Sequence, residues 1–306
     1  MRIGYPCLNR SLSCSPARTF RLASWSDERL SETVTANLSC LENILSYNIA
    51  HGLFFFRITS DLVPFASHPV NTFPWKEHFS AEFRRMGEFI RSHRIRISMH
   101  PDQFVLLNTP DPRILERSIA DLRYHVQILD LMELDAPAKV QLHVGGVYRD
   151  KPAAIDRFVN AYDLLEKSVL KRLVIENDER LYCVSDCLAI HERTSIPVLL
   201  DVFHHSINNN HERFGNLLER VNATWKNSDG IPMVDYSSQL QGRRAGAHAD
   251  HIDPEDFRSF LDASMPFDFD IMLEIKDKEK SALAALSIAK NDPRLYRAPT
   301  KIGSDP

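Results

Sequence analysis

The chain has no long apolar stretch. No run approaches the roughly 18 apolar residues that a membrane-spanning helix needs. The first six residues, Met1 to Pro6, also lack the apolar centre of a secretory signal peptide. The hydrophobic fraction of 43% and the charged fraction of 25% are ordinary for a soluble globular protein. We therefore expect a soluble, cytoplasmic protein with no membrane partner.

Cysteine is scarce, and its spacing does not suit a structural metal. The five cysteines contain no Cys-x-x-Cys pair, which is the usual signature of a structural zinc site. An odd number of cysteines in a chain of 306 residues also differs from the disulfide framework of small secreted domains. We expect reduced thiols in a cytosolic protein.

Glycine is scarce as well, and no glycine-rich phosphate loop is present. The 10 Gly and 17 Pro are spread along the chain, so no flexible linker marks a domain boundary. The segment Gly4-Tyr5-Pro6-Cys7, at the end of the first expected strand, is not Gly-x-Gly-x-x-Gly, which disfavours an open dinucleotide-binding sheet. We expect a single domain over residues 1–306, with about residues 291–306 as a C-terminal extension.

Positive charge is not in excess. The chain carries 37 Lys and Arg against 41 Asp and Glu, with a net charge of −4 and a pI near 6.4. This balance argues against a protein that holds nucleic acid by its overall charge. A local basic rim beside a metal site stays possible, and Arg243 and Arg244, in an expected loop, are candidates for phosphate contacts.

The chain does have a regular alternation of short apolar segments and helical segments. The apolar segments predict eight strands at residues 2–5, 53–58, 95–99, 139–144, 173–176, 197–203, 232–236 and 269–275. The predicted helices follow them at residues 28–50, 77–93, 112–133, 151–168, 184–193, 211–224, 254–263 and 280–289. Eight such units favour a closed (β/α)₈ TIM barrel in the α/β class over an open sheet.

Six of the apolar segments end in residues of metal-binding type. These residues are His100, His143, Glu176, Asp201 with His204, Asp235 and Glu274. Active sites of β/α barrels lie at the carboxyl ends of the strands, so these side chains are expected around one mouth. Glu176 follows Leu-Val-Ile, and a buried carboxylate without a partner costs several kcal/mol, which predicts a cation nearby.

Histidines and carboxylates without thiolates are typical of catalytic metal sites and suit Mn²⁺, Zn²⁺ or Fe²⁺. The candidate ligands exceed the coordination number of one ion, and Glu176 is able to bridge two ions about 3.5–4 Å apart. Asp201 and His204 both reach the mouth only if the strand ends near Asp201 and the chain turns. His205 is expected to make a supporting hydrogen bond or to cap a helix.

Eight motifs surround these residues. They are Gly4-Tyr5-Pro6-Cys7-Leu8-Asn9, Pro64-Phe65-Ala66-Ser67-His68-Pro69, Ser98-Met99-His100-Pro101-Asp102-Gln103, Leu142-His143-Val144-Gly145-Gly146, Ile175-Glu176-Asn177-Asp178-Glu179-Arg180, Asp201-Val202-Phe203-His204-His205, Gly246-Ala247-His248-Ala249-Asp250 and Glu274-Ile275-Lys276-Asp277-Lys278-Glu279. Over nearly the whole chain, this set resembles the ultraviolet-damage endonucleases, which are relatives of the endonuclease IV type of apurinic-site nuclease.

The resemblance implies a barrel that holds two or three divalent ions, typically manganese, with zinc or magnesium as alternatives. It assigns His100, His143 and Glu176 to one ion, Glu176, Asp201, Asp235 and Glu274 to a second, His204 and His248 to a third, and His68 to the outer site. Asp235 stands where some relatives have His, which makes the second site more acidic here. Met233 stands where some relatives have a lysine that can be modified, so no such lysine is expected.

The resemblance also implies contacts to damaged DNA. Gln103 and Phe104 match a Gln–aromatic pair that probes the duplex, and Tyr5 and Asn9 match positions that contact the flipped lesion. Phe104 stands where relatives often have Tyr, so it keeps a stacking face but loses the hydroxyl. From the residues alone, Phe104 is equally a core aromatic, and Tyr5 and Asn9 are equally parts of a strand-end turn.

The resulting hypothesis is a DNA-repair endonuclease that cuts double-stranded DNA 5′ to ultraviolet photolesions and needs no obligatory protein partner. Glu176, Glu274 and Asp201 are its candidate catalytic residues, with a water between two ions attacking the phosphate in line. A sugar isomerase or epimerase is the alternative, and it would need a separate proton-transfer base. A damage-binding protein is a third reading, which the acidic cluster disfavours because carboxylates without metal repel phosphate.

Overall fold

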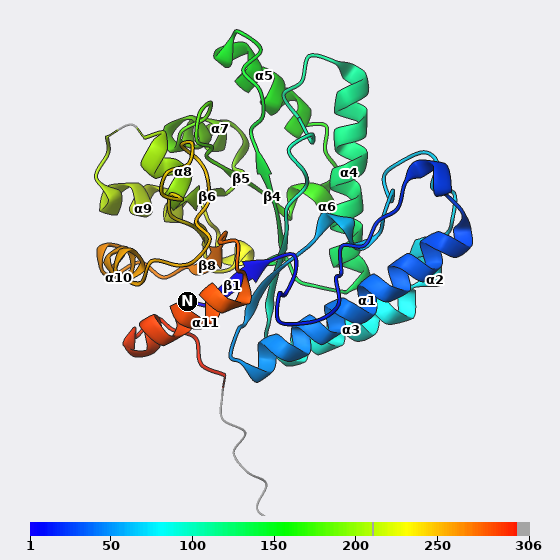
Figure 1. Ribbon diagram of the computed structural model, residues 1–306. Coiled ribbons are helices and arrows are strands. Elements are labelled where there is room, and N and C mark those ends of the chain that lie inside the picture. Colours follow the sequence, from blue (N-terminus) through cyan, green and yellow to red (C-terminus); the bar gives the residue numbers. More distant parts are fainter. Residues whose placement is uncertain (210, 299–306) are drawn as a thin grey trace, which may run out of the picture.

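The computed structural model describes residues 1–209 and 211–298 and shows a closed barrel of eight parallel strands surrounded by helices (Figure 1). The strands follow one another around the barrel in sequence order, and β1 pairs with β8 to close it. The predicted TIM barrel is confirmed. None of the helices in these two ranges is long and apolar enough to cross a membrane.

All eight predicted strands are present, with ends that differ from the predicted ones by a few residues. They are β1 (Ile3–Pro6), β2 (Phe55–Ile58), β3 (Arg96–Met99), β4 (Lys139–His143), β5 (Leu173–Glu176), β6 (Val198–Asp201), β7 (Met233–Tyr236) and β8 (Asp270–Leu273). Because all of them run in the same direction, their carboxyl ends meet at one mouth of the barrel.

The helices surround the barrel. They are α1 (Asp27–Ala50), α2 (Trp75–His78), α3 (Ser80–Ser92), α4 (Pro112–Leu131), α5 (Lys151–Tyr162), α6 (Lys167–Leu170), α7 (Val184–Thr194), α8 (Val202–Ile207), α9 (Phe214–Ala223), α10 (Pro254–Ala263) and α11 (Glu279–Ile288). Short 3₁₀ turns lie at η1 (Leu22–Ser24), η2 (Ser60–Leu62), η3 (Asn227–Asp229) and η4 (Ala289–Asn291). Figure 1 shows α1 and α3 side by side on one flank and α10 near α11 on the other.

Three helices begin as their sequences predict, with an aspartate cap followed by proline. Asp111, Asp150 and Asp253 each accept a hydrogen bond from a backbone N–H in the first turn. The predicted helix over residues 151–168 is wrong in one respect, because α5 and α6 are separate. Glu166, just before α6, has an extended backbone that interrupts the helix.

The barrel interior is packed in layers. In β5, Leu173 and Ile175 join the large core formed with the helices, whereas Val174 between them belongs to a second apolar cluster. The second cluster consists of Phe55, Val174, Leu199, Trp225, Met233 and Met272. Because alternate side chains of a strand face opposite sides of the sheet, this cluster fills the inside of the barrel. It separates the polar residues at the strand ends from those at the strand starts.

The structure corrects the expectation of reduced thiols. Cys14 and Cys40 form a disulfide, with their Cα atoms 5.7 Å apart. The expectation of reduced thiols is correct only for Cys7, Cys183 and Cys187, which are free. This pairing could not be predicted from the sequence, because the two cysteines are 26 residues apart. Only the packing of α1 against the preceding loop brings them together.

The described part of the expected C-terminal extension packs against the start of the chain. The Met1 ammonium donates a hydrogen bond to the Arg294 carbonyl at 2.6 Å. The Tyr296 N–H donates to the Met1 carbonyl at 2.8 Å. The rest of that extension, residues 299–306, lies outside the described residues, and the single-domain organisation stays a prediction.

Candidate metal centre

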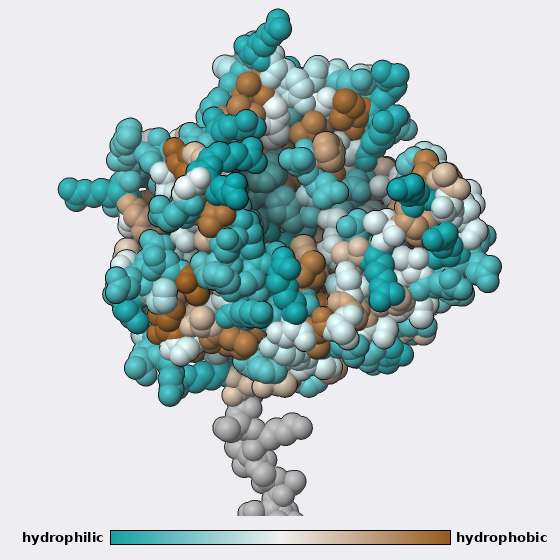
Figure 2. Space-filling model, viewed as in Figure 1, coloured by the Kyte–Doolittle hydropathy of each residue, from teal (hydrophilic) through white to brown (hydrophobic). Residues whose placement is uncertain are grey.

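The predicted strand-end residues gather at one mouth of the barrel. They are His100 after β3, His143 and Glu176 at the ends of β4 and β5, Asp201 at the end of β6, Asp235 within β7 and Glu274 after β8. A cavity of about 800 Å³ opens there, and His100, His248 and Glu274 are among the residues that line it. On the face drawn in Figure 2, a central hollow is lined mainly by hydrophilic residues.

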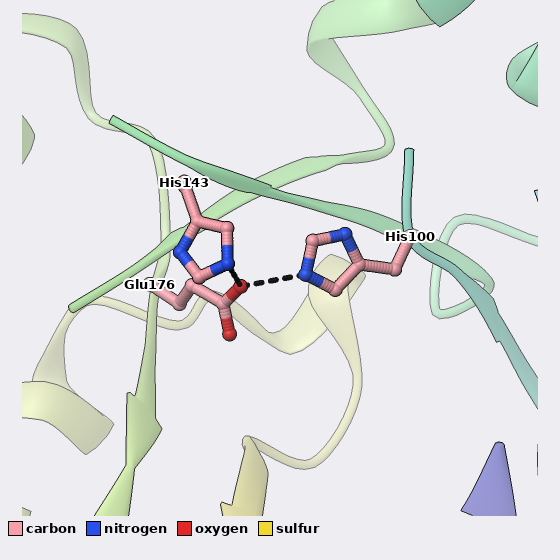
Figure 3. A group of neighbouring side chains, drawn as sticks. All are labelled: His100, His143 and Glu176. Carbon is pink, nitrogen blue, oxygen red and sulfur yellow. Dashed lines mark hydrogen bonds and ion pairs between the residues drawn. The ribbon is translucent and has the colours of Figure 1, made fainter. Parts of the chain in front are cut away.

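Two histidines converge on one carboxylate oxygen of Glu176 (Figure 3). Glu176 Oε1 lies 2.7 Å from His100 Nε2 and 3.1 Å from His143 Nε2. Glu176 is only 1% exposed, and Gln141 Nε2 donates to its Oε2 at 2.9 Å. Burial raises the pKa of Glu176, but His143 and His100 outweigh it and lower the pKa, so Glu176 is ionised. This convergence of nitrogen and oxygen atoms is suited to a divalent ion.

A second contact fixes the ring orientation of His100. His100 Nδ1 lies 2.7 Å from the carbonyl oxygen of Pro101. A carbonyl only accepts hydrogen bonds, so Nδ1 carries the proton and Nε2 faces Glu176. A backbone carbonyl that orients a histidine in this way is typical of metal-binding histidines.

A second group of possible ligands shares Glu176 with the first. One ligand atom each from Glu176, Asp201 and Asp235 lies within 4.8 Å of the others, and all three side chains are buried. Burial raises the pKa of Asp201 and of Asp235 above their ordinary values. Carboxylates this close repel one another, so a cation between them would stabilise the group. Glu176 is therefore the residue that the two groups share.

Arg57 of β2 binds the carboxylates from inside the barrel. Its Nη2 donates to both oxygens of Asp235 at 2.8 and 2.7 Å and to Gln141 Oε1 at 2.7 Å. Its Nη1 donates to Glu274. Arg57 is 3% exposed, so these ion pairs are shielded from water. Asp235 is thus an arginine partner as well as a possible ligand.

Arg57 and Gln141 are absent from the residues predicted from the sequence. Their signal was present, because each is a polar residue inside an otherwise apolar strand. Arg57 lies in Phe54-Phe55-Phe56-Arg57-Ile58, and Gln141 lies between Val140 and Leu142. A buried polar residue needs partners, and here the partners are the ligand candidates themselves.

Asp201 and His204 both reach the mouth of the barrel because β6 ends at Asp201, which is the condition stated from the sequence. β6 stops at Asp201, and α8 starts at Val202. Asp201 Oδ1 accepts the His204 N–H at 2.8 Å, and its Oδ2 lies 3.0 Å from His204 Nδ1. Burial lowers the pKa of His204, but Asp201 raises it to about 10. His205 is buried beside them, and its Nδ1 has no hydrogen-bond partner within the described chain, so the expected bond is not seen at that atom.

The histidines assigned to the third ion are less closely grouped. His248 Nδ1 donates to the Glu274 carbonyl at 2.8 Å, and its ring centroid lies 5.8 Å from that of His204. His68 is exposed, and its Nδ1 accepts the Val70 N–H at 3.1 Å. Within the described ranges, none of these three histidines belongs to either close ligand group. Their assignment to a metal stays a prediction.

Tyr5 and Asn9 lie inside the protein. The Tyr5 hydroxyl donates to Asn48 Oδ1 at 2.7 Å and accepts from Asn9 Nδ2 at 2.8 Å. Tyr5 is 0% exposed and Asn9 is 2% exposed. In this structure they form the strand-end turn, and a base would reach them only after this region opens. Their contact with a lesion stays a prediction.

Gln103 and Phe104 occupy the loop after β3, at the edge of the cavity. Phe104 is 75% exposed, so it is not a core aromatic. An exposed aromatic ring beside a cavity lined by His100 is available to stack on a base.

Basic side chains lie at the same edge. Arg244, Lys276 and Lys278 line the cavity, and Arg243 is exposed next to Arg244. Their positions form the local basic rim that the sequence left possible, and they suit contacts with phosphates.

Comparisons with known proteins agree with this geometry. The family model of the UV-endonuclease UvdE matches residues 1–295. The chain belongs to the UV-endonuclease family. A UV DNA damage endonuclease from Clostridium perfringens (strain 13 / Type A) is 36% identical over 292 residues, which cover 95% of this chain and 71% of that protein. The crystal structure of SacUVDE is 44% identical, has a TM-score of 0.91 and covers 95% of this chain and 98% of its own.

More distant structures share the fold of this UV-endonuclease. Endonuclease IV from Thermus thermophilus is 18% identical with a TM-score of 0.58, and the match covers 95% of this chain and 98% of that one. D-psicose 3-epimerase from Clostridium cellulolyticum is 12% identical with a TM-score of 0.55, and the match covers 82% of this chain and 92% of that one. At these identities the likeness shows the barrel alone.

Proposed function

We propose that this UV-endonuclease is a metal-dependent endodeoxyribonuclease that cuts double-stranded DNA on the 5′ side of ultraviolet photolesions, including cyclobutane dimers and 6-4 photoproducts. The observation that carries the proposal is the pair of ligand groups that share Glu176. Two ions joined by one carboxylate are typical of enzymes that hydrolyse phosphate esters. The substrate class, DNA damaged by ultraviolet light, is taken from the names of the relatives. The proposed activity requires no protein partner.

The side chains at the mouth fit divalent ions. The first group offers two imidazole nitrogens and a carboxylate oxygen, the second offers three carboxylate oxygens, and neither contains a thiolate, as in catalytic sites. His100 Nδ1 is held by a backbone carbonyl, so Nε2, which faces Glu176, is the nitrogen that would bind a metal in place of its proton. We propose manganese, with zinc or magnesium as alternatives. The proposed ligands are His100, His143 and Glu176 for one ion, Glu176, Asp201, Asp235 and Glu274 for a second, and His204 and His248 for a third, with His68 in the outer site.

The chain's own residues would prepare the site for a phosphate. Divalent ions bound there would supply positive charge against the phosphate and lower the pKa of a bound water. Gln141 holds Glu176, and Arg57 balances the charges of Asp235 and Glu274, so that less negative charge faces the DNA. Attack of water in line breaks the P–O3′ bond, and a proton moves from the water to the departing oxygen. The products are a 3′-hydroxyl and a 5′-phosphate.

The loop after β3 would select the damaged site. A distorted photodimer is already poorly stacked, so extruding it from the duplex costs less than extruding normal bases. Phe104, with Gln103, would fill the gap and offset part of the unstacking cost. Arg244, Lys276 and Lys278 would hold the flanking phosphates.

The test compares irradiated and unirradiated supercoiled plasmid. We expect nicking of the irradiated plasmid with Mn²⁺, loss of nicking with excess EDTA, and recovery when Mn²⁺ is added back. Nicking that persists in EDTA would contradict the metal requirement. Equal nicking of unirradiated plasmid would contradict the specificity for lesions.

The two alternatives have less support. The likeness to the sugar epimerase rests on the fold alone. Isomerisation of a ketose, with no effect on irradiated DNA, would support that reading. A protein that only binds damage would show equal affinity for the lesion with and without metal, and no nicked product.

A further inference from the structure

A second cavity lies at the opposite end of the barrel from the metal centre. It has a volume of about 470 Å³, which is within the range of small-molecule sites. Its lining comes from the end of α3, from the starts of β3 and β8, and from the chain before β1, β3, β4 and β7. The apolar cluster inside the barrel, which includes Val174 and Leu199, separates it from the metal centre.

Arg96, the first residue of β3, lines this cavity, and one edge of its guanidinium has no partner in the described structure. The side chain is buried, with the whole residue 7% exposed. Its Nη1 donates to Asp270 Oδ2 at 2.8 Å, and the guanidinium lies 5.7 Å from the ring centroids of both Phe55 and Trp225. Its Nε and Nη2 have no hydrogen-bond partner among the described residues. These two atoms form one edge of the guanidinium, the fork that binds a carboxylate with two parallel hydrogen bonds.

The charge around Arg96 is not balanced. Four arginines but only two aspartates line the cavity. Asp270 is shared between Arg96 and Arg2, whose Nη1 lies 3.3 Å from Asp270 Oδ2. Arg2 Nε is also buried without a partner in the described structure. Burial lowers the pKa of Arg96, as expected for a cation with too little opposite charge nearby.

Arg94 adds to the positive charge at the cavity edge. It is exposed and forms no ion pair within the ranges that the structure describes. Arg91, by contrast, pairs with Glu133 at 3.3 Å. The surplus charge is therefore small, which suits a ligand with a single negative charge.

The remaining walls are apolar and kept open by a glycine. Ile90, Leu134 and Ile231 are among the lining residues. Gly230 has φ +80, and a Cβ there would lie 2.9 Å from Pro137 and 3.8 Å from Arg96 Nη2. A side chain at this position would therefore narrow the space beside the free edge of Arg96.

We propose that this cavity binds a small organic anion, with its carboxylate held by the free edge of Arg96 and its apolar body against Ile90, Leu134 and Ile231. Such a ligand would satisfy the two buried donors and, unlike a neutral water molecule, would also balance the surplus charge. The inference does not depend on the proposed nuclease activity.

The first test measures binding of 4-bromobenzoate to the full metal-loaded chain by titration calorimetry. Its neutral amide, 4-bromobenzamide, has nearly the same shape and serves as the matched control ligand. We expect saturable binding of the acid, at least tenfold tighter than that of the amide. Equal affinities, or no binding of the acid, would overturn the proposal.

The second test locates the binding site with three variants. Arg96→Lys keeps the charge but removes the fork, so we expect at least a tenfold increase in Kd for the acid. Arg94→Glu changes only an exposed side chain at the cavity edge, so it gives an answer even if Arg96→Lys fails to fold, and several-fold weaker binding is expected. Arg244→Glu, at the metal mouth, is the matched control and should not change the Kd.

A result in which Arg244→Glu weakens binding while Arg94→Glu does not would assign the acid to the metal mouth and overturn the proposal. Crystals soaked in 4-bromobenzoate give an independent answer through the anomalous signal of bromine. A peak within the cavity of Arg96 supports the proposal, and a peak confined to the metal mouth contradicts it.

Discussion

At the scale of single residues, Arg57 is the side chain on which the acidic centre most depends. It is buried and forms ion pairs with both Asp235 and Glu274. Removing one partner of a buried ion pair leaves an uncompensated charge, which typically costs about 3–5 kcal/mol. In the metal-free protein we therefore expect Arg57→Met to lower the free energy of unfolding by about that amount.

Urea denaturation in EDTA measures this change. The control is Arg244→Gln, an exposed arginine at the same mouth, which should stay within about 0.5 kcal/mol of the wild type. An Arg57→Met variant as stable as the control would show that the two carboxylates do not need the guanidinium.

His204 makes the stability of the metal-free protein depend on pH. Its pKa in the folded state is about 10, because the effect of Asp201 outweighs that of burial, and its pKa in the unfolded chain is about 6.5. A pKa raised by folding contributes stability that is complete below about pH 6.5 and is lost as the pH rises through about 10. The free energy of unfolding in EDTA should therefore fall between pH 6 and pH 10, and it should fall less in His204→Asn. Equal falls in the two proteins would rule out this contribution.

At the scale of elements, the loop between β3 and α4 offers a clean separation of function from stability. Phe104 is 75% exposed and supports no core. Phe104→Ala should leave the free energy of unfolding within about 0.5 kcal/mol of the wild type. Stacking on a base is worth about 1–3 kcal/mol, so kcat/KM on irradiated DNA should fall roughly 5- to 150-fold. Phe104→Tyr keeps the ring and is the matched control, and a loss of activity in this control would contradict a stacking role.

The element boundaries explain which parts of the site the sequence could predict. The Asp-Pro pair that starts α4 at Asp111 and the apolar run before Glu176 are local patterns, which can be read from the sequence alone. The predicted strand over residues 197–203 continued through Val202 and Phe203, because apolar residues suit a strand as well as a helix. The structure ends that strand at Asp201, whose side chain caps α8, and only this turn brings His204 beside Asp201.

At the scale of the whole molecule, the barrel was predictable because each unit repeats the same local alternation. Contacts between distant segments were not, because they depend on how the units pack. Arg57 reaches Asp235 across 178 positions of sequence, and Cys14 reaches Cys40 across 26. The polar residues at the strand starts, such as Arg96, were missed for the same reason. They became visible only when the closed barrel placed them around one cavity.

The most direct test of the account is the Glu176→Gln variant on irradiated supercoiled plasmid with Mn²⁺. Glu176 belongs to both ligand groups, and an amide keeps its size but loses the charge and one acceptor oxygen. We predict that the variant folds, with a wild-type circular dichroism spectrum, and that its nicking of irradiated DNA falls to the level seen in EDTA. Undiminished nicking by the folded variant would contradict the claim that Glu176 joins two metal ions in a nuclease site.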